Sequence, residues 1–175
     1  MAFLYALPGA VAEGLIWGLM AIGVYISYKI LDIADLTVDG SICTGACVCA
    51  VLLGLGLPAW VCVLAALLAG ALTGMVTGLL HTRLGIPSIL AGILTQLMLY
   101  SVNLVTLSGK SLMPIDPRAN ALIVHMSNNP RSILVMAIVV TATIFVLYEF
   151  FYTQIGLTLK SAGDNPDMSR AQGVD

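Results

Sequence analysis

The sequence has few charged residues, and long stretches of the chain contain none. Of 175 residues, seven are Lys or Arg and nine are Asp or Glu, together 9%, whereas a soluble globular domain carries about a quarter charged residues. No charge occurs between Asp39 and Arg83. This gap is about twice the ~20 residues that a helix needs to cross ~30 Å of hydrocarbon, so the composition indicates a membrane protein. Because no Lys/Arg cluster exists, nucleic-acid binding is also excluded.

Residues for catalysis or metal binding are equally scarce. The two histidines, His81 and His125, have no Ser, Cys or metal ligand at useful spacing. Cys43 and Cys47 share a helical face that carries no His or carboxylate to complete a tetrahedral site, so we interpret the cysteines as packing residues. The stretch SGKS lacks the first glycine of a phosphate loop, because that position is Leu104. The sequence therefore predicts neither an enzyme nor a cofactor or metal site.

Apolar residues make up 59% of the chain, and breaks at proline, glycine and charge divide them into five predicted spans. The first has no basic residue before it and is expected to be retained rather than cleaved. All should be helices, because a backbone in lipid must satisfy its own hydrogen bonds and the alternating pattern of barrel strands is absent. The predicted fold is an all-α polytopic membrane bundle over residues 1–152, with spans at about 8–28, 40–56, 58–80, 86–107 and 132–152.

An odd number of spans places the two termini on opposite sides of the membrane. With the N-terminus outside, residues 108–131 form an external loop, with one short interfacial helix between its prolines, and residues 153–175 form a cytoplasmic segment. The distribution of basic residues favours this orientation by a small margin. The inner side then holds Lys29, Arg83, Lys160 and Arg170, and the outer side holds Lys110, Arg118 and Arg131.

Small residues recur at four-residue spacing in two of the spans. Such stripes let helix backbones approach closely in lipid, although membrane helices are also rich in glycine in general. Because two stripes occur, we interpret them as helix-packing surfaces. They comprise Ala66, Gly70, Gly74 and Gly78 in the third span and Ala10, Gly14 and Gly18 in the first.

The stretch LDIADLTVDGS places three carboxylates between the first two spans. If the second span starts at Gly40, Asp39 lies at its N-terminus and accepts hydrogen bonds from the free backbone N–H groups. That span is short, since ~17 residues cover only ~26 Å. The segment with Asp32 and Asp35 therefore either re-enters the membrane within the protein or forms a solvated cytoplasmic turn, and both interpretations stay open.

Two amides lie within the fourth span, where polar groups are costly. Gln96 and Asn103 are seven residues apart on one helical face, with Tyr100 between them. They either line a translocation path or form hydrogen bonds to a neighbouring helix. The polar C-terminal stretch GDNPDMSRAQG predicts one more helix, with Asn165 as its N-cap, Pro166 and Asp167 in its first turn and a glycine as its stop.

Two motifs carry a resemblance to a known family. DLTVDGSICTGA resembles the DLSVGS-type segment of ABC importer permeases for ribose and branched-chain amino acids, with Asp39 as an insertion. GLTLKSAGDNPDMSRAQGVD resembles the cytoplasmic coupling segment of the same family, with Lys160 where Arg is usual and Ser169 where Ala is usual. The subgroup that it resembles is that of aromatic amino acid permeases. The matching positions are Gly156, Leu157, Gly163, Asn165, Pro166, Arg170 and Gly173.

The resemblance implies a permease subunit of the bacterial inner membrane that moves an amino acid-like or sugar-like solute by alternating access. Its implied partners are a second permease copy, an extracytoplasmic binding protein and cytoplasmic ATPases. Family members continue for several further spans, so we expect this chain to be an N-terminal portion. The expected coupling residues are Gly163, Asp164, Asn165, Pro166, Asp167, Arg170 and Gly173, and the expected pathway residues are Asp39, Gly40, Ser41, Gln96 and Asn103.

A different class of function remains open on the sequence alone. A non-transporting membrane scaffold that binds a partner through its C-terminal helix would show the same spans and the same polar tail. The two hypotheses differ in whether a solute path runs between the spans.

Overall fold

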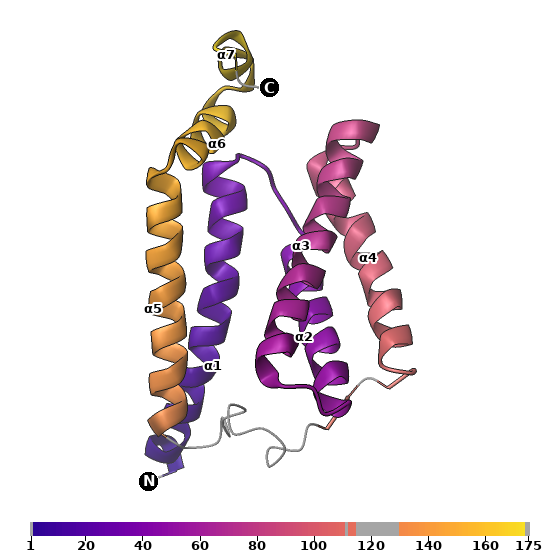
Figure 1. Ribbon diagram of the computed structural model, residues 1–175, viewed down its shortest axis with the longest axis vertical. Helices are drawn as coiled ribbons and strands as arrows, with labels where there is room; N and C mark the ends of the chain where they lie inside the picture. The colour runs from indigo at the N-terminus through magenta and orange to yellow at the C-terminus, as the bar shows by residue number, and fades with distance from the viewer. Residues whose placement is uncertain (1, 111, 115–129, 174–175) are drawn as a thin grey trace. The chain divides into compact units, whose positions relative to one another are not determined.

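The computed structural model describes residues 2–110, 112–114 and 130–173 (Figure 1). The expected all-α fold class is confirmed, because these residues form helices joined by short connections and contain no strand. The elements are α1 (Ala2–Tyr25), η1 (Ile26–Ile30), α2 (Val38–Gly54), α3 (Ala59–Leu84), α4 (Ser88–Thr106), α5 (Pro130–Tyr152), α6 (Gln154–Asp164) and α7 (Pro166–Ala171).

Four helices are long and apolar enough to cross a membrane, and α2 is a shorter apolar helix. The orientation with the N-terminus outside stays a prediction. The short helix expected between the prolines of the external loop falls at residues 115–129, outside the described residues. The four long segments are Leu7–Ile30, Ala59–Leu84, Ser88–Thr106 and Ile133–Tyr152.

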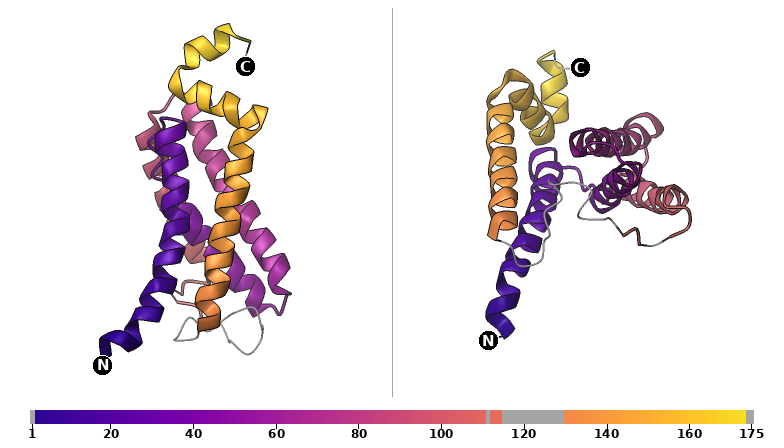
Figure 2. Two further views of the ribbon diagram at one scale, coloured as in Figure 1. Left: turned by 90° about the vertical axis from the view of Figure 1, so that its left-hand side faces the viewer. Right: turned by 60° about the horizontal axis from the view of Figure 1, so that its bottom comes forward.

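The chain divides into two units, and the first unites its two ends. It comprises Met1–Ala34 and His125–Asp175. Within it, α1 packs against α5, and both figures show these two helices running alongside each other (Figures 1 and 2). The helix α6 packs against the end of α5 and against η1, and α7 packs on α6. The C-terminal tail is therefore attached to both long helices of its unit.

The second unit, Asp35–Val124, is built around α2, which packs against both α3 and α4. Its interior consists of small residues, since Cys47, Cys62 and Ala91 are buried there together with Leu99. At Gly45 an added Cβ would lie 3.4 Å from the carbonyl oxygen of Ala66, so the backbones of α2 and α3 are in near contact. Close approach of this kind is typical of helix packing in lipid.

Buried threonines complete this interior. The hydroxyls of Thr44, Thr77 and Thr95 each donate to the carbonyl oxygen four residues earlier, at 2.9, 3.3 and 2.9 Å. A hydroxyl bonded to its own helix is satisfied and can be buried at little cost. These threonines therefore make the core of the second unit partly polar while their own hydroxyls stay hydrogen-bonded.

The glycines of the two stripes lie outside this interior. Apart from the backbone of each glycine's own helix, no described atom lies within 4 Å of a Cβ added at Gly14, Gly18, Gly70, Gly74 or Gly78. The reason on α3 is that α2 and α4 select the neighbouring face, where Thr73 and Thr77 are buried. Of the α3 stripe, Ala66 contacts α2. A role for the five glycines in contacts with other chains stays a prediction.

Candidate functional site

The acidic stretch begins where α1 changes its helical geometry. The last five residues before it form the π-helix η1, and Leu31 N–H donates to the carbonyl oxygen of Ile26 at 3.1 Å. A single π-turn of this kind is frequent at functional sites. Asp32 follows with φ 54°, a value that a non-glycine residue seldom adopts, and its side chain is exposed. The chain is thereby turned out of the helix before α2 starts.

The end of the same stretch is buried in the second unit. Thr37 is 1% exposed, and its hydroxyl shares a hydrogen bond of 2.9 Å with that of Thr77 on α3. An added Cβ at Gly92 of α4 would lie 2.9 Å from the backbone nitrogen of Leu36, so only glycine fits there. Thr37 is thus enclosed in protein, whereas the side chain of Leu36 is 48% exposed. The re-entrant interpretation of this segment stays a prediction.

Asp39 does not cap α2, contrary to expectation. The carboxylate of Asp35 accepts a hydrogen bond of 2.8 Å from Thr37 N–H, and the helix begins at Val38, two residues earlier than predicted. Asp39 is consequently within the first turn, and its Oδ2 accepts a hydrogen bond of 3.4 Å from Nε2 of Gln96 on α4. The carboxylate therefore faces another helix.

A pocket of about 350 Å³ opens between α2 and α4 at this point. Four of the five expected pathway residues line it, and Ser41 does not, because its hydroxyl donates to the carbonyl oxygen of Val38 at 2.9 Å. Gly40 is buried and lets the helices approach, since its added Cβ would lie 3.3 Å from Cδ1 of Leu99. The lining comprises Asp39, Gly40, Cys43, Ile93, Gln96, Leu97, Tyr100 and Asn103.

The polar groups of this pocket are not fully paired. Asn103 is 7% exposed, and its Oδ1 has no hydrogen-bond partner in the described part of the chain. Leaving a buried acceptor unpaired costs ~1–3 kcal/mol, so such a group calls for an explanation. Within the described residues Asp39 has one side-chain hydrogen bond, the long one from Gln96, and no Lys or Arg is among the lining residues. The exposed carboxylate of Asp39 is thus a free acceptor of the pocket, whereas Oδ1 of Asn103 is sealed from solvent.

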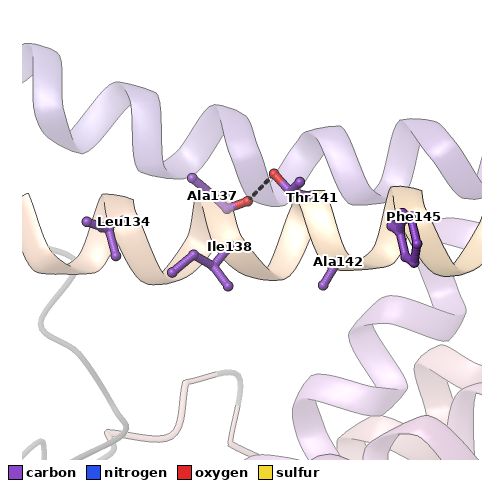
Figure 3. Close-up of a pocket in the computed structure, with 6 residues that line it drawn as sticks. All are labelled: Leu134, Ala137, Ile138, Thr141, Ala142 and Phe145. Carbon is purple, nitrogen blue, oxygen red and sulfur yellow. Dashed lines mark hydrogen bonds between the residues drawn. The ribbon is translucent and has the colours of Figure 1, made fainter.

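A second hollow, of about 520 Å³, lies on one side of α5 (Figure 3). Its polar group is satisfied, because the hydroxyl of Thr141 donates to the carbonyl oxygen of Ala137 at 2.7 Å. The remainder is apolar, so this surface suits lipid or another helix rather than a polar solute. It is lined by Leu134, Ala137, Ile138, Thr141, Ala142 and Phe145.

The predicted coupling segment comprises α6 and α7. The side chain of Thr153 caps α6 by accepting from Gly156 N–H at 3.3 Å. Gly156 is buried where a Cβ would collide with the carbonyl oxygen of Phe150, and a Cβ at Gly163 would collide with that of Ile30 in η1. Both glycines therefore serve close packing of α6. The expected part of Gly163 in ATPase coupling stays a prediction.

The helix expected in the tail is confirmed as α7. Asn165 is its N-cap, with Oδ1 accepting from Met168 N–H at 3.1 Å, and Pro166 occupies the first turn. Gly173 follows the helix with φ 88°, a conformation in which glycine has no steric penalty. The exposed side chains of this region are Asp164, Asn165, Asp167, Met168 and Arg170.

Three site residues were not anticipated from the sequence. Ser169 is 4% exposed, and its hydroxyl donates to the carbonyl oxygen of Asn165 at 3.1 Å and to Oγ of Ser161 at 3.4 Å, which joins α7 to α6. The departure from the usual Ala at this position was a signal that pointed to it. Gly92 and Thr37 gave no local signal, because their partners lie on other helices.

Comparisons with known proteins agree with these motifs. A family model described as the permease component of branched-chain amino acid transport systems matches residues 8–175. A tyrosine transport system permease protein of Clostridioides difficile (strain R20291) is 39% identical over 164 residues, which cover 93% of this chain and 54% of the relative. The uncharacterized protein RP368 of Rickettsia prowazekii (strain Madrid E) is 32% identical over 160 residues, 91% of this chain and 55% of the relative.

The chain thus spans about half the length of these two relatives. No solved structure matches it significantly.

Proposed function

Because this chain belongs to the family of permease components of branched-chain amino acid transport systems, we propose that it is a membrane subunit of an ABC importer for an amino acid. The observation that supports this most directly is the family match over residues 8–175, since it includes both the acidic stretch and the C-terminal tail. Tyrosine is the first substrate to test, because the relative that is 39% identical is named as a tyrosine transport system permease protein.

In the proposed mechanism, the C-terminal tail and the pocket between α2 and α4 have different tasks. Cytoplasmic ATPases bind the exposed side of α7, around Asp167, Met168 and Arg170. Their movement reaches α1 through the contact of α6 with η1 at Gly163. The solute, delivered by an extracytoplasmic binding protein, passes along a path that includes Asp39, Gly40, Gln96 and Asn103. A second permease copy completes the pore in the bacterial inner membrane.

The proposal is tested in proteoliposomes that contain the full-length permease, its ATPase and its binding protein. We expect substrate-loaded binding protein to stimulate ATP hydrolysis, and Arg170→Glu to reduce that stimulation at least about tenfold, as loss of a desolvated charged contact does. The matched control is Lys110→Glu, which makes the same charge change at an exposed residue on the predicted outer side. If Arg170→Glu couples as well as the control does, α7 is not the ATPase contact.

A further inference from the structure

We propose that Cys49 of α2 and Cys62 of α3 form a redox site, which an external disulfide oxidises to a reversible cross-link between the two helices. Both cysteines are free thiols in the structure. The site lies within the second unit, and its assignment does not depend on the proposed transport function.

The register of α2 against α3 brings the two cysteines face to face. The helices pack against each other across a short turn, and a Cβ added at Gly45 would lie 3.8 Å from that of Ala66, about the ~3.8 Å between the Cβ atoms of a disulfide. Each cysteine lies four residues from its member of this pair, in the direction of the turn. Because residues four apart share a helical face, Cys49 and Cys62 are the next facing pair. The two thiols are also close enough for their charges to interact.

The turn between the helices fixes this register. The backbone N–H groups of Gly56, with φ 79°, and of Leu57 donate to carbonyl oxygens in the last turn of α2, at 3.0 and 3.3 Å. Together these two bonds form the Schellman pattern, which ends a helix in a defined conformation. The carbonyl oxygen of Pro58, which precedes α3, accepts from Cys62 N–H at 3.3 Å. Backbone hydrogen bonds on both sides of the turn therefore hold Cys62 at a fixed position relative to α2.

The two thiols differ in exposure, and this difference sets the order of the reaction. Cys62 is 0% exposed, and its Sγ donates to the carbonyl oxygen of Leu57 at 3.8 Å, whereas Cys49 is partly exposed. The thiolate of Cys49 therefore attacks one sulfur of the external disulfide, which releases the first half of that reagent as a thiolate and leaves the second half bound to Cys49.

The second step closes the cross-link. The thiolate of Cys62 attacks Sγ of Cys49, so that a bond forms between the two cysteine sulfurs and the second half of the reagent leaves as a thiolate. Over both steps the two cysteine thiols lose two electrons and two protons, and one external disulfide is reduced to two thiols. A reducing thiol reverses both steps.

The position of the pair along the helices suits an oxidant from one side of the membrane. Cys62 lies in the first turn of α3, and Cys49 lies close to the end of α2. Both are therefore near the turn, which is on the outer side in the predicted orientation. Disulfides form and persist in the bacterial periplasm but are rare in the cytosol, so the external disulfide is one of the outer compartment.

The test uses the full-length permease in membrane vesicles, with dithiodipyridine as a neutral disulfide reagent. After the reaction, remaining thiols are alkylated, and the denatured protein is digested with chymotrypsin, which cleaves after Trp60 between the two cysteines. Mass spectrometry with fragment spectra then identifies which cysteines are joined. We expect the link from Cys49 to Cys62 to be at least about tenfold more abundant than one from Cys47 to Cys62, because only cysteines in suitable register are bridged without backbone movement.

Two substitutions serve as matched variants. Cys49→Ser should abolish the cross-link, and Cys47→Ser, two residues away on another face of α2, should leave it unchanged. A second measurement follows the Tm of the detergent-solubilised protein. We expect oxidation to raise the Tm, because a cross-link restricts the unfolded chain, and we expect dithiothreitol to reverse the rise.

Three results would overturn the inference. The first is a Cys49 that stays joined to half of the reagent while Cys62 is recovered as a free thiol. The second is a Cys49 that does not react in the folded protein. The third is a link from Cys47 to Cys62 that is as abundant as the link from Cys49. All three are read from the unsubstituted chain, so they do not depend on the folding of a variant.

Discussion

The two units of the chain bury their spans to very different degrees. In the second unit, 28% of the residues in the most apolar window of α4 and 11% of those in α3 are buried. In the first unit, the corresponding values are 6% for the span Leu7–Ile30 and 0% for Ile133–Tyr152. The second unit therefore has an interior of its own, whereas the long helices of the first leave most of their apolar surface for lipid or for further protein.

The kind of residue that is buried differs in the same way. Among the residues that the structure describes, six of the seven buried polar ones lie in the second unit and Ser169 lies in the first; the six are Thr37, Thr44, Thr73, Thr77, Thr95 and Asn103. A polar interior needs fixed geometry, because each buried group must keep its partner. A pocket that recognises a solute is best placed on such a unit. The more exposed first unit, which carries the tail, is suited to transmit movement.

The largest effect is expected from a substitution at Gly92, which tests whether the second unit has a tightly packed interior. Gly92→Val forces a side chain against the backbone nitrogen of Leu36, and we expect a loss of about 3 kcal/mol of stability, at the upper end of what overpacking costs. Thermal denaturation of the detergent-solubilised protein measures the effect. Gly74→Val is the matched control, because nothing described lies within 4 Å of its added Cβ, and it should change stability by less than about 1 kcal/mol. Equal losses for both variants would contradict the packing at Gly92.

The next effect concerns the tight contact of the tail with η1 at Gly163. Gly163→Ala places a methyl group against the carbonyl oxygen of Ile30, and separation of α6 from η1 should cost about 2 kcal/mol locally. We expect substrate-stimulated ATP hydrolysis to fall about tenfold while ATP hydrolysis without substrate stays unchanged. Gly70→Ala, in open space, is the control. Normal stimulation in Gly163→Ala would show that this contact does not transmit movement.

A smaller effect is expected at the hydrogen bond between Thr37 and Thr77. Thr37→Val removes one hydroxyl from a fully buried pair and should cost about 1–2 kcal/mol. A double-mutant cycle with Thr77→Val separates the pair from the individual residues. Thr82→Val is the control, since the exposed hydroxyl of Thr82 bonds only to Gly78 of its own helix. Strict additivity in the cycle would mean that the pair does not hold residues 36 and 37 in place.

The smallest effect should be confined to the tail. Asn165→Ala removes the N-cap of α7, which costs ~1 kcal/mol, and should accelerate hydrogen exchange at the amide of Met168 about fivefold. Gln172→Ala, at the other end of the same helix, is the control, because Gln172 caps the helix through its backbone N–H and its side chain is exposed. Thermal stability of the whole protein should be unchanged in both variants. A fall in overall stability for Asn165→Ala would show that the tail is part of the folded core.

Sequence reasoning singled out residues of the candidate site where a chemical cost marked them, and their part in a solute path stays a prediction. Gln96 and Asn103 were identified because amides are expensive in an apolar helix, and both line the pocket with Asp39 and Gly40. Ser41 is not among the lining residues, and its hydroxyl bonds to its own helix. The backbone contact at Gly163 could not be read from the sequence, because its partner Ile30 lies more than a hundred residues away along the chain.

The approximate positions of the helices could be predicted from local sequence signals. Apolar runs, prolines and the signals around Asn165 and Gly173 act within a few residues, since backbone hydrogen bonds and caps are local. The choice of a buried face is different, because it depends on helices that are tens of residues away. Thus α2 and α4 met the threonine face of α3 and left the glycines of its stripe open, and they brought Asp39 to Gln96 across 57 positions of sequence. Local energetics places the helices, and packing between distant segments selects the faces that form the pocket.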